Sequence, residues 1–295
     1  MITRTKSRFN VVFAAIASAF ILISMASIQD ANAFDWRNGD DNYRYKWTCE
    51  ESLEVNSVNV VLHGEGGEGL SYEPSSLLKN GDTEALFDNI LESCGLIIVP
   101  SASPADYFTW DYTGYKTANS EIGRVTNLII LANDLFDLPV NLIGGSAGGS
   151  MAFAIASRLN RIGRTDLIGK LVIVEAISPY DVRIDGILPA YDGIGPLTCV
   201  GPTNEYTLGG ELVENEECNF IRMGLPNSNA SFDIDTLIVY SADDDVTPFE
   251  QKDILAKTIV HFSTIGPATA HIIISGEGHD IGSGGWGSVQ SFILD

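Results

Sequence analysis

Ser146 lies at the centre of a G-x-S-x-G pentapeptide that spans residues 144–148. The pentapeptide follows a short apolar run at 140–143, typical of a buried strand, and precedes a helical pattern at 150–159. In that context the motif predicts a nucleophile elbow, a strained turn that exposes the serine hydroxyl at the carboxyl end of a sheet. A glycine-rich turn without chemistry is the alternative interpretation.

A serine hydroxyl needs a base to act as a nucleophile, and the chain offers four histidines. His279 follows the apolar run 271–274 in a glycine-rich loop, which makes it the best-placed base. His261 lies within a helical pattern and His271 starts a strand, so we expect both to be structural. A surface histidine without a catalytic role is the alternative for His279.

The acid that would orient this base is expected among three adjacent aspartates at 243–245, which follow the apolar run 237–240. A solvated acidic loop or a calcium site would also explain such a run. The order Ser, Asp, His along the chain favours a catalytic triad, with Asp244 as the acid and Asp243 as the second choice.

An oxyanion hole is expected where the apolar run 58–62 leads into His63 and a glycine-rich loop. One backbone amide would come from Ala147, which follows the candidate nucleophile, and the other from Glu65, with Gly64 as the second choice. His63 would then brace the loop and would not be the base.

The candidate residues lie in a sequence in which short apolar runs alternate with helical patterns. Near-continuous apolar strands between helices predict an α/β fold, with a mostly parallel sheet that has helices on both faces. Apolar residues at 122–136 recur every three or four positions and predict a helix, and 249–262 has a second helical pattern. Residues 178–235 are rich in Gly, Pro, Asn and Glu and predict a cap-like insertion. The six apolar runs are 58–62, 96–99, 140–143, 171–174, 237–240 and 271–274.

Composition and charge limit the partners. The 295 residues are 45% hydrophobic and 19% charged, which excludes a disordered chain. Acidic residues outnumber basic ones by 39 to 17, for a formal charge of −22. Such a surface repels phosphate backbones, so no nucleic-acid partner is expected and a neutral or cationic substrate is favoured.

The N-terminus has the pattern of a secretory signal peptide over residues 1–33. Basic residues precede an apolar run at 11–25, and Ala31-Asn32-Ala33 is an A-x-A cleavage site. An uncleaved membrane anchor is the alternative. Cleavage would leave one domain at 34–295, secreted or periplasmic, with no membrane association.

No cofactor or metal site is predicted. Residues 64–69 contain G-x-G-x-x-G, but two glutamates there would repel a pyrophosphate, which disfavours a dinucleotide. The cysteines lack C-x-x-C pairs and nearby histidines, which disfavours zinc. In an exported chain their even number predicts disulfides. Neighbours in sequence suggest the pairs Cys49–Cys94 and Cys199–Cys218.

Taken together, these motifs resemble the α/β-hydrolase superfamily, and within it the secreted polyhydroxybutyrate-depolymerase and feruloyl-esterase-like group. The matching residues are His63-Gly64, Trp110, the elbow at 145–149 and the loop at 276–279. The resemblance implies that Ser146, His279 and Asp244 form a triad that cleaves a small-molecule or polymer carboxylic ester through an acyl-enzyme.

Two departures from the group bear on the substrate. The acid loop of the group begins with His-Gly, whereas this chain has Tyr240-Ser241, and the insertion at 178–235 has no counterpart in the pattern. A serine peptidase or lipase with the same triad is therefore an alternative, and so is a binding module that has lost catalysis. The oligomeric state is not predicted.

Overall fold

A computed structural model gives the fold. The predicted signal peptide, Glu65, His261 and most of the predicted insertion lie outside the residues that the structure describes. Those residues are 37–38, 43–48, 55–64, 82–102, 110, 120–176, 197–200, 205–208, 211–213, 233–244, 246, 249, 252–253, 255–256, 259–260, 269–276 and 278–295.

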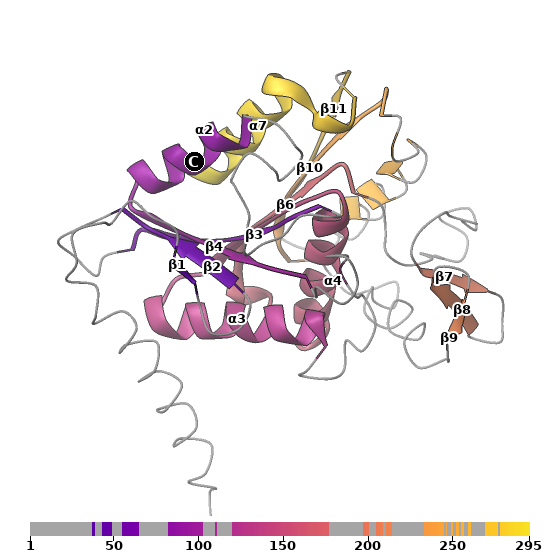
Figure 1. The fold of residues 1–295 in the computed structure, drawn as a ribbon, viewed down its shortest axis with the longest axis horizontal. Coiled ribbons are helices and arrows are strands. Elements are labelled where there is room, and N and C mark those ends of the chain that lie inside the picture. The colour runs from indigo at the N-terminus through magenta and orange to yellow at the C-terminus, as the bar shows by residue number, and fades with distance from the viewer. Residues whose placement is uncertain are drawn as a thin grey trace, which may run out of the picture.

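An eight-stranded sheet forms the centre of the molecule, in the order β1-β2-β4-β3-β5-β6-β10-β11 (Figure 1). The pairs β1–β2 and β2–β4 are antiparallel. Every neighbouring pair from β4 to β11 in this order is parallel. The six apolar runs all lie in strands, which confirms the predicted mostly parallel sheet. The strands are β1 Arg37–Asn38, β2 Tyr43–Lys46, β3 Ser57–Leu62, β4 Gly95–Pro100, β5 Val140–Gly145, β6 Ile168–Val174, β10 Asp235–Ser241 and β11 Ala270–Ser275.

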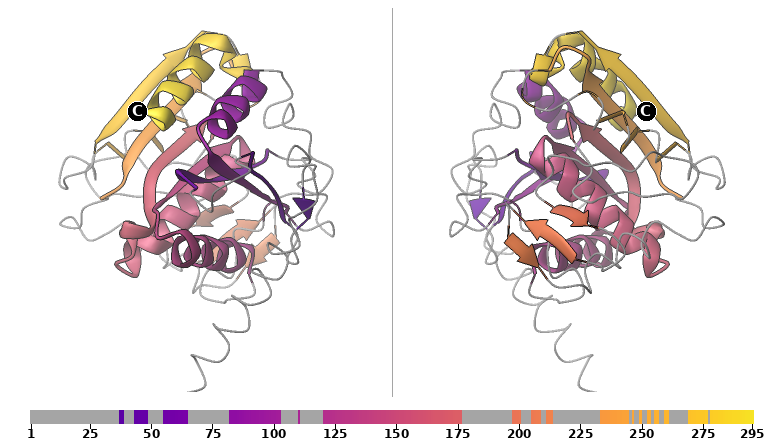
Figure 2. Two further views of the ribbon diagram at one scale, coloured as in Figure 1. Left: turned by 90° about the vertical axis from the view of Figure 1, so that its left-hand side faces the viewer. Right: turned by 90° about the vertical axis from the view of Figure 1, so that its right-hand side faces the viewer.

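Helices cover both faces of this sheet (Figure 2). The helices α3 (Glu121–Phe136) and α4 (Ala147–Arg161) pack on one face, and α2 (Asp82–Glu92) and α7 (Gly282–Leu294) pack on the other. Two short 3₁₀ helices, η3 (Thr165–Leu167) and η4 (Gly278–Asp280), complete the main body.

Burial on both faces explains why the central strands are apolar without alternation. In β4, Leu96 and Ile98 join the core under α3 and α4, whereas Ile97 and Val99 join the core under α2 and α7. Successive side chains of a strand point to opposite faces, so a strand with helices on both sides must be apolar throughout.

The helix α3 has the predicted apolar stripe. Ile122, Val125, Ile129 and Ala132 are buried, and Phe136 is partly buried at the end of the helix. The Ser120 hydroxyl caps the start by accepting a hydrogen bond from the Gly123 amide at 3.0 Å.

Part of the predicted insertion forms a separate three-stranded antiparallel sheet, β7 (Leu197–Val200), β8 (Glu205–Leu208) and β9 (Glu211–Val213). Its presence shows that the segment between β6 and β10 contains regular structure of its own. Among the described residues, no helix has both the length and the apolar character to cross a bilayer.

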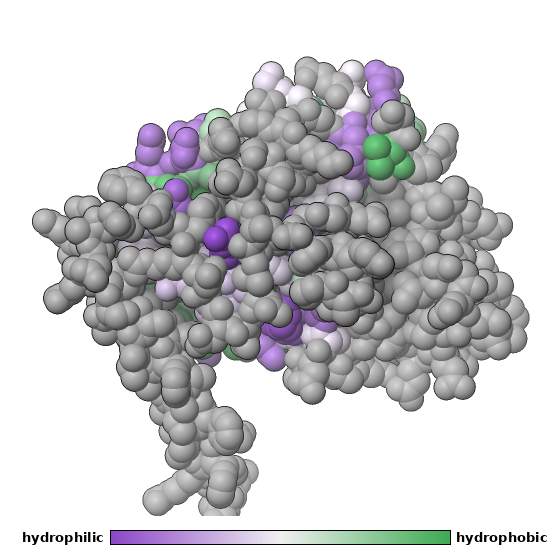
Figure 3. Space-filling model, viewed as in Figure 1, coloured by the Kyte–Doolittle hydropathy of each residue, from purple (hydrophilic) through white to green (hydrophobic). Residues whose placement is uncertain are grey.

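The surface view of Figure 3 shows mainly hydrophilic described side chains, with small hydrophobic patches between them. Large apolar side chains that are exposed among the described residues include Ile162, Val246, Ile272, Ile274 and Leu294.

Only part of the predicted disulfide arrangement falls within the structure. The Thr48 hydroxyl donates a hydrogen bond to the Leu91 carbonyl at 2.7 Å, which brings residue 48 next to the turn that contains Cys94. Cys49 and Cys218 lie outside the described residues. The two pairings therefore remain predictions.

Candidate active site

Ser146 occupies a strained turn between β5 and α4. Its backbone has φ 51° and ψ −123°, in the left-handed half of φ space that non-glycine residues rarely adopt. The Ser146 amide donates to the Val174 carbonyl at 2.8 Å, and the Ser146 carbonyl accepts from the amides of Gly149 and Ser150. Strain of about 1–3 kcal/mol at one residue is typical of functional sites.

Glycines beside Ser146 allow the strand and the helix to approach. A Cβ atom on Gly144 would lie 2.2 Å from the Gly148 carbonyl oxygen, and one on Gly148 would lie 2.1 Å from the Leu62 carbonyl oxygen. Both positions therefore exclude every other residue unless the backbone moves. The strained turn between strand and helix that the sequence predicts around Ser146 is present.

Three loops that carry the candidate triad leave the sheet at the same edge. The Ser146 amide bonds to the end of β6, the Glu175 amide bonds to the Val239 carbonyl of β10 at 2.9 Å, and Ser241 pairs with Ser275. The ends of β5, β6, β10 and β11 are thus level. Neighbouring strands lie about 4.8 Å apart, so the nucleophile and the acid loop start about 10 Å from each other.

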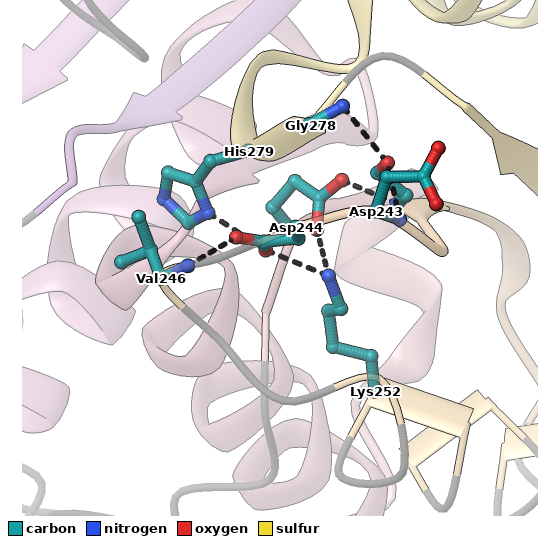
Figure 4. Close-up of polar contacts among 8 residues, drawn as sticks. Asp243, Asp244, Val246, Lys252, Gly278 and His279 are labelled. Carbon is teal, nitrogen blue, oxygen red and sulfur yellow. Dashed lines mark hydrogen bonds and ion pairs between the residues drawn. The ribbon is translucent and has the colours of Figure 1, made fainter.

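Asp244 and His279 are in direct contact (Figure 4). The distance from Asp244 Oδ2 to His279 Nδ1 is 2.9 Å. The Asp244 side chain is fully buried, whereas 23% of the His279 side chain is exposed. The Val246 amide donates to Asp244 Oδ1 at 2.7 Å. The neighbouring Asp243 is exposed, and of these two candidates Asp244 is the one that accepts the hydrogen bond from the imidazole.

Solved structures share this arrangement of elements. TT1662 from Thermus thermophilus is 14% identical, with a TM-score of 0.55, over 88% of this chain and 98% of that one. Est1E from Butyrivibrio proteoclasticus with bound ferulic acid is 14% identical, with a TM-score of 0.51, over 88% of this chain and 98% of that one. The chain has the α/β-hydrolase fold. No protein-family model and no curated protein match the sequence.

Behind Asp244 lies a buried ion pair that the sequence did not predict. Lys252 Nζ lies 2.6 Å from Asp244 Oδ2 and 2.5 Å from Glu175 Oε2. The side chains of Lys252 and Glu175 are 1% and 0% exposed. Glu175 follows β6 with φ 49°, and its Oε1 accepts a hydrogen bond from the Ser241 amide.

Burial raises the pKa of Glu175 to about 8, because the charged carboxylate is removed from water. This value includes two further effects: the hydrogen bond and charge of Lys252 lower the pKa, and the nearby Asp244 raises it. Glu175 is therefore a carboxyl group whose ionisation depends on its partner.

The cluster also has the donors of a metal site. Ligand atoms of Glu175, Asp244 and His279 lie within 4.8 Å of one another. However, Lys252 Nζ touches a carboxylate oxygen of both acids, so the ammonium holds the position that a metal cation would need. These residues do not fit a metal ion, and we derive no metal-dependent step.

The Ser241 hydroxyl joins the acid loop to the histidine loop. Its oxygen accepts hydrogen bonds from the Asp243 amide at 3.1 Å and from the Gly278 amide at 3.0 Å (Figure 4). The residue is fully buried. The sequence departs from the esterase-like pattern at this position, and the hydroxyl gives the departure a structural role.

His63 braces the loop after β3, as predicted. Its Nδ1 donates to the Gly64 carbonyl at 2.7 Å, and its Nε2 accepts from the Ala102 amide at 3.0 Å. The Trp110 ring stacks on the imidazole with 4.7 Å between the ring centroids, and the Trp110 Nε1 donates to the His63 carbonyl. Because Nε2 accepts a hydrogen bond, the imidazole is neutral and is not available as a base.

This burial predicts a loss of stability in acid. Desolvation lowers the pKa of His63 from 6.5 to about 4, so between these values the unfolded chain binds a proton that the folded chain excludes. Stability is therefore lost as the pH falls from 6.5 towards 4. Urea unfolding should show a loss of up to about 3 kcal/mol from this residue.

His63→Gln should remove this part of the pH dependence, although it lowers stability at every pH. His271→Gln is the matched control, because His271 is exposed on β11. Equal pH slopes for the wild type and His63→Gln would contradict the interpretation.

Proposed function

We propose that the protein is a serine hydrolase that cleaves carboxylic esters. The observation that carries the proposal is a strained Ser146 at the sheet edge where a buried Asp244 holds His279. A hydroxyl, an imidazole and a carboxylate in these roles form the catalytic apparatus of acyl transfer. The α/β-hydrolase fold supports this class of reaction, since Est1E, with ferulic acid bound, has the same fold.

Each residue has one role in the proposed reaction. Asp244 accepts a hydrogen bond from the Nδ1–H of His279, which leaves Nε2 free to take the proton of Ser146. The Ser146 oxygen then attacks the ester carbonyl, and the alcohol leaves with the proton from His279. A water activated by His279 hydrolyses the acyl-enzyme, and Asp244 stays ionised beside the imidazolium.

Backbone amides would stabilise the negative oxygen of the tetrahedral intermediate. Ala147 starts α4, so its amide lies at the helix N-terminus, where the partial charge is positive. Glu65 is the proposed second donor, on the loop that His63 braces. Two such donors contribute about 3–4 kcal/mol to catalysis when water is excluded.

We further propose that the substrate is a neutral or cationic small-molecule or polymer ester, since the chain has a formal charge of −22. Removal of residues 1–33 would place the enzyme outside the cell or in the periplasm. The Cys49–Cys94 pair would then tie the N-terminal segment to the turn before β4, in keeping with the bond from Thr48 to Leu91.

A fluorophosphonate probe tests the proposed function. We expect one covalent label per chain, located on Ser146 by peptide mass spectrometry, and competition by ester substrates. Nitrophenyl esters, peptide anilides and long-chain lipids then separate an esterase from a peptidase or a lipase. Folded protein that takes no label on Ser146 would reject the hydrolase and favour a binding module.

A further inference from the structure

The buried pair of Lys252 and Glu175 has no role in the reaction described above, yet it touches the triad acid. We propose that Lys252 is a positioning residue that keeps Asp244 ionised and oriented towards His279 against the competing charge of Glu175. This inference rests on the proposed function, because it assigns a role within the same site. The site would then contain a series of contacts that runs from Glu175 through Lys252 and Asp244 to His279.

The contacts of Asp244 define what Lys252 does. Oδ2 accepts from both His279 Nδ1 and Lys252 Nζ, at 2.9 and 2.6 Å, while Oδ1 accepts from the Val246 amide. These three donors fix the carboxylate plane. Of the three, Lys252 is the one permanent cation, and it acts on the same oxygen that orients the base.

Glu175 explains why a cation is needed at this position. Oxygens of Glu175 and Asp244 lie within 4.8 Å of each other, and both side chains are fully buried. Two buried carboxylates at that separation do not both ionise unless a cation lies between them. With Lys252 beside it the Asp244 carboxylate can stay ionised, which favours the imidazolium formed on His279 during acyl transfer.

Stability alone does not account for the pair. Burying two charges costs desolvation energy, and apolar residues of similar size often give equal or greater stability. A backbone group satisfies only one oxygen of Glu175. Oε1 accepts a hydrogen bond from the Ser241 amide, whereas Oε2 accepts from Lys252. Other charged groups on these elements, among the residues that the structure describes, include Asp243, which is exposed, and Asp253, which accepts a hydrogen bond from the Tyr240 hydroxyl.

Lys252→Met and Glu175→Gln test the proposal, singly and together. Lys252→Met should lower kcat for a nitrophenyl ester by roughly 10- to 100-fold with KM little changed, because a buried partner of Asp244 is lost. Adding Glu175→Gln should restore kcat by at least about fivefold, because the competing charge is removed. Lys170→Met is the control, since Lys170 lies near the start of β6, away from the end that the site loops leave, and its Nζ bonds to the Phe292 carbonyl.

A purely structural role predicts the opposite order. The two changes would then add, and the double variant would be slower than Lys252→Met. That result, or wild-type kcat in Lys252→Met, would overturn the proposal. If Lys252→Met alone does not fold, the double variant decides. It should keep kcat within about tenfold of the wild type, and a deeper loss in folded protein counts against the positioning role.

Proton NMR of the His279 Nδ1–H separates this inference from the proposed function, because it does not depend on turnover. The far-downfield signal of a proton shared with a carboxylate should be lost in Lys252→Met and return in the double variant. A signal unchanged by Lys252→Met would overturn the inference even if the wild type labels at Ser146. If the probe does not label Ser146 but the NMR signal is lost in Lys252→Met and returns in the double variant, the proposed hydrolysis is rejected and the positioning role of Lys252 is kept.

Discussion

Ser146→Ala is expected to lower kcat/KM for ester hydrolysis by roughly five to six orders of magnitude, with the fold intact. The reason is that His279 and Asp244 have no other nucleophile to activate, so the remaining rate comes from binding and the oxyanion donors. Kinetics on a nitrophenyl ester measure the loss. Circular dichroism and thermal unfolding check that the variant is folded.

Two further serine variants control this result. Ser157→Ala changes a buried hydroxyl of α4 that has no hydrogen-bond partner among the described residues, so activity should be unchanged. Ser146→Gly should be as inactive as Ser146→Ala but more stable by about 1 kcal/mol, because glycine relieves the positive φ. Substantial activity in folded Ser146→Ala would remove the assignment of the nucleophile.

The central strands were predictable because their burial leaves a direct mark on the sequence. A parallel strand with helices on both faces is expected to be mostly apolar, and β3 through β6 meet that condition except at a few polar positions such as Asn59, Asn141 and Lys170. The helix α7 was not predicted, since it contains four glycines and three serines within residues 282–294. It is helical because Trp286, Val289 and Ile293 pack in the core, and tertiary packing overrides weak propensity.

Buried aromatic residues show a similar limit. An aromatic residue can line a pocket or belong to the core, and sequence alone does not decide this for Trp110 and Trp286. The structure gives them 2% and 3% exposure, and each packs within a core cluster.

Sequence motifs predicted only those residues of the candidate site that belong to a motif. The order of Ser146, Asp244 and His279 identified three loops that do leave one edge of the sheet, although it could not distinguish Asp243 from Asp244. Glu175 and Lys252 were missed because the ion pair joins positions 77 residues apart. A single glutamate directly after the apolar run 171–174 was the available signal, since that position lies at the functional edge of a parallel sheet.

Asp244→Asn should reduce kcat by roughly 10⁴-fold and leave KM little changed. An asparagine amide can present its NH₂ to His279, which favours the wrong tautomer and leaves Nε2 protonated and unable to accept from Ser146. The fold should persist, because Lys252 still pairs with Glu175 and the Val246 amide can still bond to the side-chain oxygen.

Asp243→Asn is the matched control, one residue away, with the same change of chemistry on an exposed side chain. Its kcat should stay within about twofold of the wild type, in line with the small effects of exposed substitutions. The reverse order, with Asp243→Asn inactive and Asp244→Asn active, would require the two loops to rearrange before catalysis. Because Asp244 is held by His279, Lys252 and Val246 at once, such a rearrangement would break all three bonds. The comparison therefore tests whether the observed hydrogen bond between Asp244 and His279 is the one used in the reaction.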